Sequence, residues 1–482
     1  MWRIKFLLLF ILVIFSVIKA QANQTRMLSL EEAIFLAVRE NPNVQTSQLS
    51  HVEQKFQLEI QQWQFQPHYG LQATSTTSRS YAVTTNGYVS QNATGFQPSV
   101  SLLTPLGTQM SLTSTNNVTN HFNPGLSLQI MQPLMQGFGK PIVEAALNDA
   151  IESEKISRLS VEGTLRSTVT SVINAYLDVV SLQNTLEIDQ QALARSENSR
   201  KQTQLFIKAG HKAGVELVAV LADVASAETR IENDKNNVDQ ARYALLTTIG
   251  IDPNTQVAFS NVNVRQLINK YHVPTLDQSK SMILENDIQY QTDQITLNGS
   301  MKRNVLIAED NTRWRLDLSV SSTAGNSSGG GRNAGINSLV NGVNQTNSAS
   351  LNLTVPIDDR PAKLALSSAK IALRQAELAL VQEKWGKETS VINSWNTIYS
   401  ALRATHFAEN AEQLQEKTYH ISFQKYSYGL IDSLELQTAQ QQYSAAQQAL
   451  LNARISYLKA LMNLDLLVGT TLQTWDVKVK YL

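Results

Sequence analysis

The residues that could do chemistry in this chain are few and widely spaced. Gly137-Phe138-Gly139-Lys140 places glycines beside a lysine, as in loops that hold phosphate groups. The stretch lacks the GxxxxGK[ST] spacing of such loops, and Pro141 follows the lysine, so we do not interpret it as a phosphate site. The histidines show neither an HExxH motif nor a paired ligand spacing. The seven are His51, His68, His121, His211, His272, His406 and His420. No Ser/His/Asp arrangement can be argued, so we predict no enzyme, no metal site and no cofactor.

Two acidic residues stand just after glycine-containing turns between long apolar-periodic segments. Glu216 follows Gly210 and Gly214, and Glu435 follows Gly429. A carboxylate in the first turn of a helix is stabilised by the partial positive charge of that helix end. The simplest interpretation is that both are solvated first-turn residues.

Composition excludes several classes of protein. The 482 residues carry a net charge of zero and have a mean hydropathy of −0.19. Nothing resembles the basic patch of a nucleic-acid-binding protein, and the chain is not a bundle of transmembrane helices. There is no cysteine, hence no disulfide and no cysteine that could be lipidated. Any membrane contact must therefore come from the protein itself.

Residues 1–22 predict a secretory signal peptide. Two positive charges precede the apolar run from Phe6 to Ile18, and Ala20-Gln21-Ala22 is a small-x-small cleavage site. An apolar run this short cannot span a bilayer as an anchor. Cleavage removes three basic residues and no acid, so the remaining chain carries a net charge of about −3.

The corner between a strand and a very long helix organises the sequence. Leu126, Leu128 and Ile130 alternate with polar residues, which is typical of a strand with two unlike faces. After Pro141 the apolar period becomes helical and stays so to residue 209. At 1.5 Å per residue this helix is roughly 100 Å long, which is too long for an ordinary globular domain.

The same order of elements occurs twice. The first repeat, 23–254, is predicted as helix 28–66, strands 67–133, long helix 141–209 and return helix 215–249. A linker, 255–273, follows. The second repeat, 274–469, is predicted as helix 275–310, strands 312–356, long helix 361–428 and return helix 433–467, before a tail at 470–482. Asn41 matches Asn286, and Pro133 matches Pro356.

Alternating strands around polar loops are typical of a transmembrane β-barrel with lipid outside and water inside. One repeat pair has too few strands to close a barrel, and an open sheet edge cannot exist in lipid. The chain must therefore form oligomers. The long helices would continue the lumen of the barrel away from the membrane.

This arrangement resembles the TolC-type outer membrane efflux protein family, in its non-lipidated branch, over nearly all of the chain after the signal peptide. The resemblance rests on the corner QPLMQGFGKP, on its copy VPIDDRP, and most of all on YSYGLIDSLELQTAQQQYSAAQQALLNARISYL. It implies an α+β membrane protein: a homotrimer with a twelve-stranded barrel and a long α-helical periplasmic barrel. It implies the exit duct of a tripartite efflux or type I secretion system, with a periplasmic adaptor and an inner membrane transporter as partners. The expected location is the outer membrane of a Gram-negative bacterium.

The resemblance also implies a gate at the periplasmic end, where acidic side chains from the turns form rings. Carried over by position, the acidic place falls on Glu435 and the tyrosine on Tyr426. The next acidic place holds Thr438, and the basic place holds Ile431. In the first half, Glu216 takes the acidic place, and Lys212 lies two residues past Gly210. The alternative of solvated first-turn glutamates stays open, because two matched positions have changed type.

Three further groups of residues follow from the resemblance. The turns expected to meet the adaptor contain Gly210, Gly214, Gly429 and Asp432. The corners expected to join barrel and tunnel contain Pro133, Gly137, Gly139, Pro141, Pro356 and Pro361. The aromatic residues expected at the membrane boundary are Tyr69, Phe122 and Trp314.

One segment departs from the duplication. Residues 97–116 have no counterpart in the second half and are either an enlarged surface loop or an extra pair of strands. A rival function, a trimeric adhesive stalk with a membrane barrel, is disfavoured because the strands lie in the middle of each repeat. The sequence does not reveal the cargo.

Overall fold

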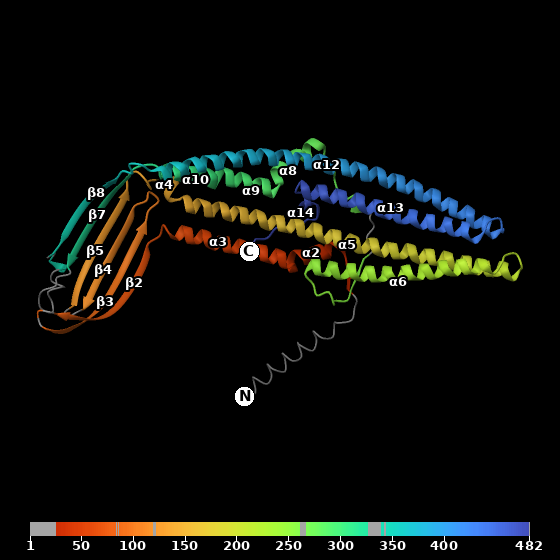
Figure 1. Cartoon of the computed structure of the whole chain (residues 1–482), viewed down its shortest axis with the longest axis horizontal. Helices are drawn as coiled ribbons and strands as arrows, with labels where there is room; N and C mark the ends of the chain where they lie inside the picture. Colours follow the sequence, from red (N-terminus) through yellow and green to blue (C-terminus); the bar gives the residue numbers. More distant parts are fainter. Residues whose placement is uncertain are drawn as a thin grey trace, which may run out of the picture. The chain divides into compact units, whose positions relative to one another are not determined.

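A computed structural model describes residues 26–82, 84, 86–118, 122–260, 267–325, 339–341 and 344–481. The predicted signal peptide lies outside these residues. The described chain forms two compact units. We call residues up to 48, 161–287 and 385–481 the helical unit, and residues 49–160 and 288–384 the sheet unit. Figure 1 labels the helices and strands of both units.

The helices are α2 (Leu30–Glu40), α3 (Pro42–Trp63), α4 (Lys140–Val143), α5 (Ala145–Lys208), α6 (Val215–Ile249), α8 (Leu276–Asn286), α9 (Ile288–Thr296), the π-helical turn η2 (Leu297–Met301), α10 (Lys302–Asp310), α12 (Arg360–Ser427), α13 (Ser433–Leu467) and α14 (Thr471–Thr474). The strands are β1 (Arg26–Leu28), β2 (His68–Ala82), β3 (Gly87–Leu103), β4 (Gln109–Val118), β5 (Phe122–Pro133), β6 (Val257–Phe259), β7 (Arg315–Gly325) and β8 (Thr346–Thr354). None of the described helices has an apolar stretch long enough to cross a membrane.

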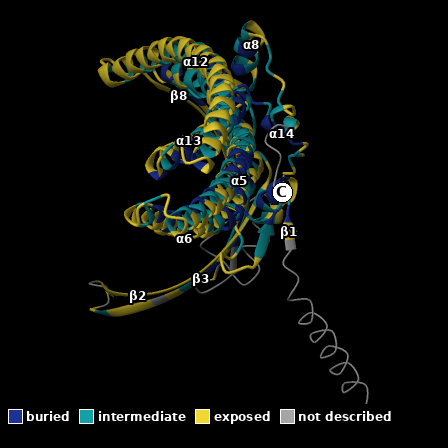
Figure 2. Ribbon diagram, turned by 90° about the vertical axis from the view of Figure 1, so that its right-hand side faces the viewer, coloured by how far each residue is buried: buried dark blue, intermediate teal, exposed yellow. Residues whose placement is uncertain are grey.

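The core of the helical unit is built around the middle of α5. Val169, Tyr176 and Val180 are almost fully buried, within an apolar cluster that includes residues of α2, α6 and α13. Figure 2 shows α5 mostly buried or intermediate, whereas much of α12 and α6 is exposed. The middle of α5 therefore packs against several helical neighbours at once, while α6 and α12 keep much of their surface exposed.

The predicted linker contains a strand. β6 pairs with β1 in parallel, with Leu28 opposite Phe259. The hydroxyl of buried Tyr176 lies 3.1 Å from the carbonyl oxygen of Leu28 and 2.9 Å from that of Ser260. Three residues are too few for a periodicity signal, so this strand was not predicted.

The internal duplication is visible in the capping of the short helices. Ser29 caps α2 and Thr275 caps α8, each in a capping box. Asn41 Nδ2 donates to the Thr248 carbonyl (2.7 Å), and Asn286 Nδ2 donates to the Val468 carbonyl (3.0 Å). Each asparagine thus satisfies a carbonyl at or near the end of a return helix, which would otherwise lack a partner.

Replacing Asn41 by alanine is expected to destabilise the helical unit by about 1–3 kcal/mol, because a carbonyl in a half-buried site loses its donor. The side-chain oxygen also accepts from the backbone N–H of Asn43 (2.8 Å) at the start of α3. Thermal unfolding followed by far-UV circular dichroism would measure the effect. Asn43→Ala, at an exposed position, is the control. Equal midpoints for the two variants would contradict the assignment.

The sheet unit contains a six-stranded antiparallel sheet in the order β2-β3-β4-β5-β7-β8. Four strands come from the first half of the chain and two from the second. Residues 97–116, which the sequence left undecided between a loop and strands, lie in β3, β4 and their connecting turn. The two halves meet where β5 pairs with β7, with Ile130 opposite Val320.

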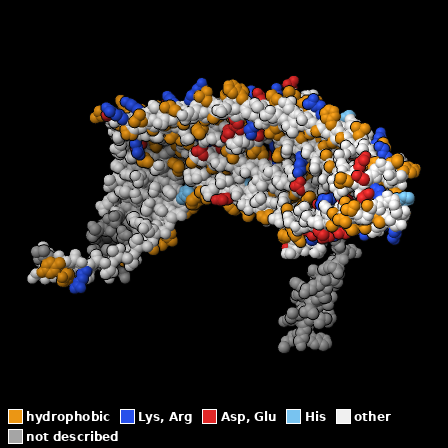
Figure 3. Space-filling view, turned by 45° about the vertical axis from the view of Figure 1, so that its right-hand side comes forward, with side chains coloured by type: hydrophobic (Ala, Val, Ile, Leu, Met, Phe, Trp, Pro, Cys, Tyr) orange, Lys and Arg blue, Asp and Glu red, His pale blue; other side chains and the backbone are white. Residues whose placement is uncertain are grey.

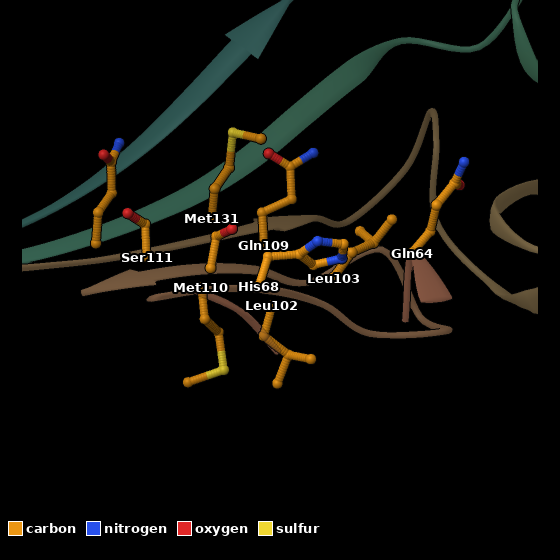
Figure 4. A pocket seen from close by; sticks show the side chains of 10 residues that line it. Gln64, His68, Leu102, Leu103, Gln109, Met110, Ser111 and Met131 are labelled. Atoms are coloured by element: carbon orange, nitrogen blue, oxygen red, sulfur yellow. The ribbon is translucent and has the colours of Figure 1, made fainter. Parts of the chain in front are cut away.

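The sheet has one apolar and one polar face. Val100, Leu112 and Leu128 lie in one cross-strand row, and Ser99, Thr113 and Ser127 lie in the adjacent row on the other face. Figure 4 shows the same division beside the turn between β3 and β4. Leu102 and Met110 point to one side of the strands, and Gln109 and Met131 point to the other. Both faces are open to solvent in the single chain.

The second short helical segment is more broken than predicted. The expected helix 275–310 is interrupted at Asp287 and by the π-helical turn η2. Within that turn, Gly299 packs directly against the carboxylate of Glu152. The same carboxylate accepts from Arg303 Nη1 at 2.6 Å. A side chain at position 299 would collide with the carboxylate of this ion pair, which explains why the residue is glycine.

Candidate functional site

The helical unit ends in two helix hairpins whose turns share one geometry. Gly210 (φ +75°) and Gly429 (φ +73°) have left-handed backbones. The N–H of His211 donates to the Phe206 carbonyl (2.8 Å), and the N–H of Leu430 donates to the Lys425 carbonyl (2.9 Å). This is the Schellman pattern, which favours glycine at the left-handed position. Figure 1 shows both turns at the same end of the helical unit.

Four side chains link the two hairpin ends, and we call Thr203, Lys212, Glu216 and Tyr426 the clasp. The hydroxyls of Thr203 and Tyr426 lie 2.5 Å apart, and both residues are fully buried. Lys212 Nζ donates to Glu216 Oε2 at 2.9 Å and to the Ile431 carbonyl at 3.3 Å. It also lies 4.2 Å from the centre of the Tyr426 ring. The first hairpin thus contacts both the helix end and the turn of the second.

The clasp places a charge where water has little access. The Lys212 side chain is only 8% exposed. A buried ammonium is tolerated when a carboxylate, a carbonyl oxygen and an aromatic face surround it. Removing any of these partners leaves a desolvated charge, so the clasp stabilises one arrangement of the hairpin ends.

The structure brings together three of the five residues predicted for the gate. Lys212, Glu216 and Tyr426 belong to the clasp, whereas Glu435 and Thr438 are exposed on the first turns of α13. Asp432 caps α13 by accepting from the N–H of Glu435 at 2.8 Å. Gly214 precedes α6 with ordinary helical dihedrals. Its position therefore does not require glycine.

Sequence reasoning missed a polar seam between α5 and α13 above the clasp. Gln440 Nε2 donates to Ser199 Oγ at 3.0 Å, and Arg195 Nη2 donates to Ser444 Oγ at 2.8 Å. The carboxylate of Asp223 on α6 accepts hydrogen bonds from Ser196 Oγ of α5 and from Gln437 Nε2 of α13. The signal was present: Ser196, Ser199 and Thr203 keep helical 3–4 spacing, as do Gln437, Gln440 and Ser444. A periodicity of apolar residues does not reveal such a seam, because the side chains that form it are polar.

An acidic pair lies further from the turns, on α5 and α6. Burial and a hydrogen bond with Asp189 raise the pKa of Asp234 to about 6. Asp189 is itself buried, and Arg230 Nε lies 3.9 Å from its carboxylate oxygen. Two carboxyls so close together favour sharing one proton.

The acidic pair predicts a pH dependence of stability. A carboxyl with a raised pKa binds its proton more tightly in the folded state, so its contribution grows as the pH falls from about 6 toward about 4. Replacing Asp234 by asparagine is expected to raise the unfolding temperature at pH 7 and to reduce the difference between pH 7 and pH 5. Asp239→Asn, an exposed position on the same helix, is the control. If both variants follow the wild-type profile, the pair is not coupled in this way.

In the sheet unit, the first corner joins β5 to α4 and α5. Gly137 (φ +81°) and Gly139 (φ +100°) take backbones that other residues rarely adopt. The N–H of Gly137 donates to Asp310 Oδ2 at 2.7 Å, and Pro141 lies in the first turn of α4. The predicted continuous helix from 141 is interrupted at Glu144, whose backbone (φ −87°, ψ 9°) leaves the helical region.

The second corner is simpler. β8 ends at Thr354, and α12 begins at Arg360 with Pro361 in its first turn. Asp359 Oδ1 accepts from the N–H of Ala362 at 3.0 Å. A side chain here performs the capping that the first corner leaves to backbone turns, so the second corner needs no glycine.

The predicted boundary aromatics lie at or beside strands. Tyr69 of β2 and Trp314, just before β7, are exposed. Phe122 begins β5, but its side chain lies outside the described part of the structure. Both exposed rings lie where a strand begins after a helix, Tyr69 after α3 and Trp314 after α10.

No group of three or more potential metal-ligating residues occurs among the described residues. Cavities in the sheet unit are open depressions. One of about 500 Å³ on the polar face is lined by His68, Gln109 and Met131, among others, and Figure 4 shows these side chains pointing to the same side. The described residues thus form a polar face on the sheet and, at the hairpin ends, the clasp.

Comparison with known proteins identifies the family. The sequence matches the family described as "Outer membrane efflux protein" over residues 33–251 and 284–470. No curated protein matches the chain. Among solved structures, CusC is similar with 14% identity and a TM-score of 0.70, covering 91% of this chain and 92% of that one.

Two other solved structures show the same fold similarity. VceC from Vibrio cholerae is 15% identical with a TM-score of 0.66, covering 91% of this chain and 96% of that one. The MtrE outer membrane channel of Neisseria gonorrhoeae, in its open state, is 16% identical with a TM-score of 0.67, covering 92% and 89%. With the family match spanning most of the sequence, the chain belongs to the outer membrane efflux protein family.

Proposed function

We propose that three copies of this chain form the exit duct of a tripartite efflux system. The duct carries solutes passively from the periplasm through the outer membrane of a Gram-negative bacterium. The family match supports a channel and gives no support to an enzyme or to an adhesive stalk. The observation that carries the trimer proposal is a sheet with one apolar face and two unpaired edges, β2 and β8.

The sheet supports barrel closure between copies. An unpaired edge leaves backbone N–H and C=O groups without partners, which is not tolerated in lipid. Pairing β2 of one copy with β8 of the next would satisfy both edges and close the barrel. The apolar rows then face lipid and the serine, threonine and glutamine rows face water. Figure 3 shows charged side chains over the helices and few on the sheet.

The helical unit supports the same assembly independently. The part of α12 in this unit carries an exposed apolar stripe, with near-heptad spacing and exposed fractions between 37% and 68%. Its members are Trp385, Ile392, Tyr399, Phe407, Leu414 and Ile421. Such a stripe is typical of a helix with a missing partner helix. A lumen surface would be polar, so we assign this stripe to contact with a second copy.

We assign the clasp to the closed state of the periplasmic gate. It joins the two hairpin ends of one copy through a buried lysine and two buried hydroxyls. Opening would require Lys212 to leave the Tyr426 ring and the Ile431 carbonyl. The polar seam above the clasp supports this role, because hydrogen-bonded seams can separate into water at lower cost than apolar ones.

The exposed carboxylate of Glu435 is a second part of the proposed gate. Glu435 lies on the first turn of α13 with its side chain exposed, where three-fold symmetry would repeat it around the opening. We expect Glu435→Gln to reduce the cation selectivity of the channel in planar bilayers, because three carboxylates attract cations in a narrow opening. Glu228→Gln, an exposed acid farther along α6, is the control. Unchanged selectivity in Glu435→Gln would favour the simpler interpretation of a solvated first-turn residue.

We propose that the hairpin ends also bind the periplasmic adaptor, which connects the duct to an inner membrane transporter. The turns around Gly210, Gly214, Gly429 and Asp432 are flanked by exposed apolar residues. These are Val215, Val218, Tyr428, Leu430 and Leu434. Clustered apolar side chains on a protein end mark an interaction surface.

We propose that both corners lie at the inner edge of the membrane. There Pro133, Gly137, Gly139 and Pro141 turn the first strand into a helix, and Pro356 and Pro361 turn the second. Tyr69 and Trp314 would lie at the lipid boundary, as amphipathic rings do.

Deletion of the gene tests the function. Loss of efflux predicts increased sensitivity to several unrelated toxic compounds, restored by the intact gene. Loss of a secreted protein with normal compound sensitivity would favour a type I secretion duct. Loss of surface adhesion alone would favour the stalk and overturn the proposal.

A further inference from the structure

The sheet unit contains two more strands than a twelve-stranded trimer would need. Twelve strands require four from each copy, whereas this chain has six in one sheet. The additional pair is β3 with β4, residues Gly87–Val118, which we call the inserted hairpin. It lies between β2 and β5 in both sequence and space.

The inserted hairpin is hydrogen-bonded into the sheet along its length. β4 pairs with β5 over ten successive rows, from Gln109 opposite Met131 to Val118 opposite Phe122. β3 pairs with β2 from Ser101 opposite His68 to Gly87 opposite Ala82. A surface loop lying over a complete four-stranded wall would leave β2 paired with β5, which is not observed.

The apolar face continues across the inserted hairpin. Val100 and Leu112 lie in one row with Leu128 of β5. Leu102 and Met110 lie in the next row on that face, opposite each other. Phe96, Pro98, Val100 and Leu102 alternate over seven residues of β3, roughly 20 Å of strand. Strands of membrane barrels tilt by about 35–45°, so this run covers roughly 15 Å of an apolar band that is about 25 Å tall.

Charge supports the same placement. Across the six strands the charged side chains are Arg79, Arg315 and Asp317. Arg79 of β2 lies where β2 and β3 extend beyond the end of β4. Its guanidinium carbon is 4.4 Å from the centre of the Tyr88 ring on β3. Arg315 and Asp317 pair with each other at 2.7 Å near the opposite end. β3 and β4 carry no charge at all, as expected for strands that face lipid on one side.

The turn of the inserted hairpin is built into the first corner. The N–H of Gly139 donates to the Leu106 carbonyl at 3.3 Å. Gly107 (φ +91°) packs so closely on the Gly137 carbonyl that a Cβ would lie 2.9 Å from its oxygen. The hairpin therefore turns where β5 becomes helix, at the same level as the other strands.

We propose that the inserted hairpin is an additional pair of membrane-spanning strands, so that three copies form a barrel of eighteen strands, three times the six observed. Barrel diameter grows roughly linearly with strand number, so this barrel would be about one and a half times as wide as one of twelve strands. The outer membrane section then admits wider solutes, while the helix hairpin ends remain the narrow point. The inference rests on the proposed trimeric barrel.

Site-directed fluorescence tests the placement of the hairpin. The chain has no cysteine, so each introduced cysteine can be labelled alone. The variants are Ser99→Cys and Val100→Cys on β3, and Thr113→Cys and Leu112→Cys on β4. Ser127→Cys and Leu128→Cys on β5 are the matched controls in the same rows. Each carries a small fluorophore in the full-length protein, reconstituted in liposomes.

We expect nitroxide groups on lipid acyl chains to quench labels at 100 and 112 as strongly as at 128. Iodide in water is expected to quench labels at 99 and 113 as strongly as at 127. If labels on both faces of β3 and β4 respond to iodide while 128 responds to lipid, the hairpin lies in water and the proposal is wrong. If position 128 also fails to respond to lipid, the barrel itself is wrong. The two failures are therefore distinguishable.

Electron cryo-microscopy of the full-length protein in lipid nanodiscs tests the strand number directly. Eighteen strands around one axis are expected. A trimer with twelve strands, and the inserted hairpin outside the wall or inside the lumen, would overturn the inference while leaving the exit duct intact.

Discussion

A double variant in the clasp, Lys212→Met with Tyr426→Phe, is expected to leave the channel mostly open. Lys212 loses a charge-assisted hydrogen bond to the Ile431 carbonyl and its position over the Tyr426 ring. Tyr426 loses the hydroxyl that lies 2.5 Å from that of Thr203. Interactions of this kind contribute about 1–3 kcal/mol each. We therefore expect a loss of at least about 2 kcal/mol per copy.

The trimer multiplies this loss. Three copies that open together would lose roughly 6 kcal/mol of stabilisation of the closed state, and about 5.5 kcal/mol suffices to change a two-state ratio from 99:1 to 1:99. Single-channel recording in planar bilayers is expected to show a severalfold higher mean conductance and long-lived open states. In cells, the same variant is expected to admit large toxic compounds.

The control variant makes the same two substitutions, lysine to methionine and tyrosine to phenylalanine, at residues that do not belong to the clasp. Lys208→Met with Tyr428→Phe removes one lysine charge and one phenol hydroxyl from exposed positions near the same turns. We expect wild-type conductance from this control. Wild-type conductance from the clasp variant as well, with the trimer intact, would refute the gate role of these residues.

The contacts at the hairpin ends mark the limit of inference from sequence. Positional matching placed Ile431 where a basic residue was expected. In the structure a base does reach that position, because Lys212 from the other hairpin donates to the Ile431 carbonyl. The two residues are 219 positions apart. Periodicity and turn chemistry report on neighbours within one helix, so they cannot predict such a contact.

Sequence signals predicted helix bounds correctly where a short stretch determines its own conformation. The return helices α6 and α13 span the predicted residues, because glycine turns and a first-turn acid mark their starts. Residues 97–116, which lie in β3, β4 and their turn, were compatible with strands or with a loop, since a sheet position depends on partners elsewhere in the chain. β6 was missed because three residues in parallel pairing leave no pattern.

Charging the apolar stripe of α12 is expected to abolish the trimer. Leu414 and Ile421 lie one heptad apart on this stripe and are largely exposed in the single chain. Aspartate at both positions would place two unpaired carboxylates in each contact between copies. An uncompensated buried charge costs several kcal/mol, and the cost recurs at three contacts. Size-exclusion chromatography with light scattering, in mild detergent, is expected to show monomers in place of trimers.

A graded pair of variants separates assembly from folding. Leu414→Ala with Ile421→Ala adds no charge and leaves helix propensity intact, so the helical unit should fold while the trimer dissociates at lower denaturant concentration. Gln413→Asp adds a charge at an exposed polar position next to the stripe and should leave the trimer unchanged. If the alanine variant dissociates like wild type, the stripe does not face a second copy. If Gln413→Asp dissociates as readily as the charged stripe, general repulsion between helices, and not this apolar seam, governs assembly.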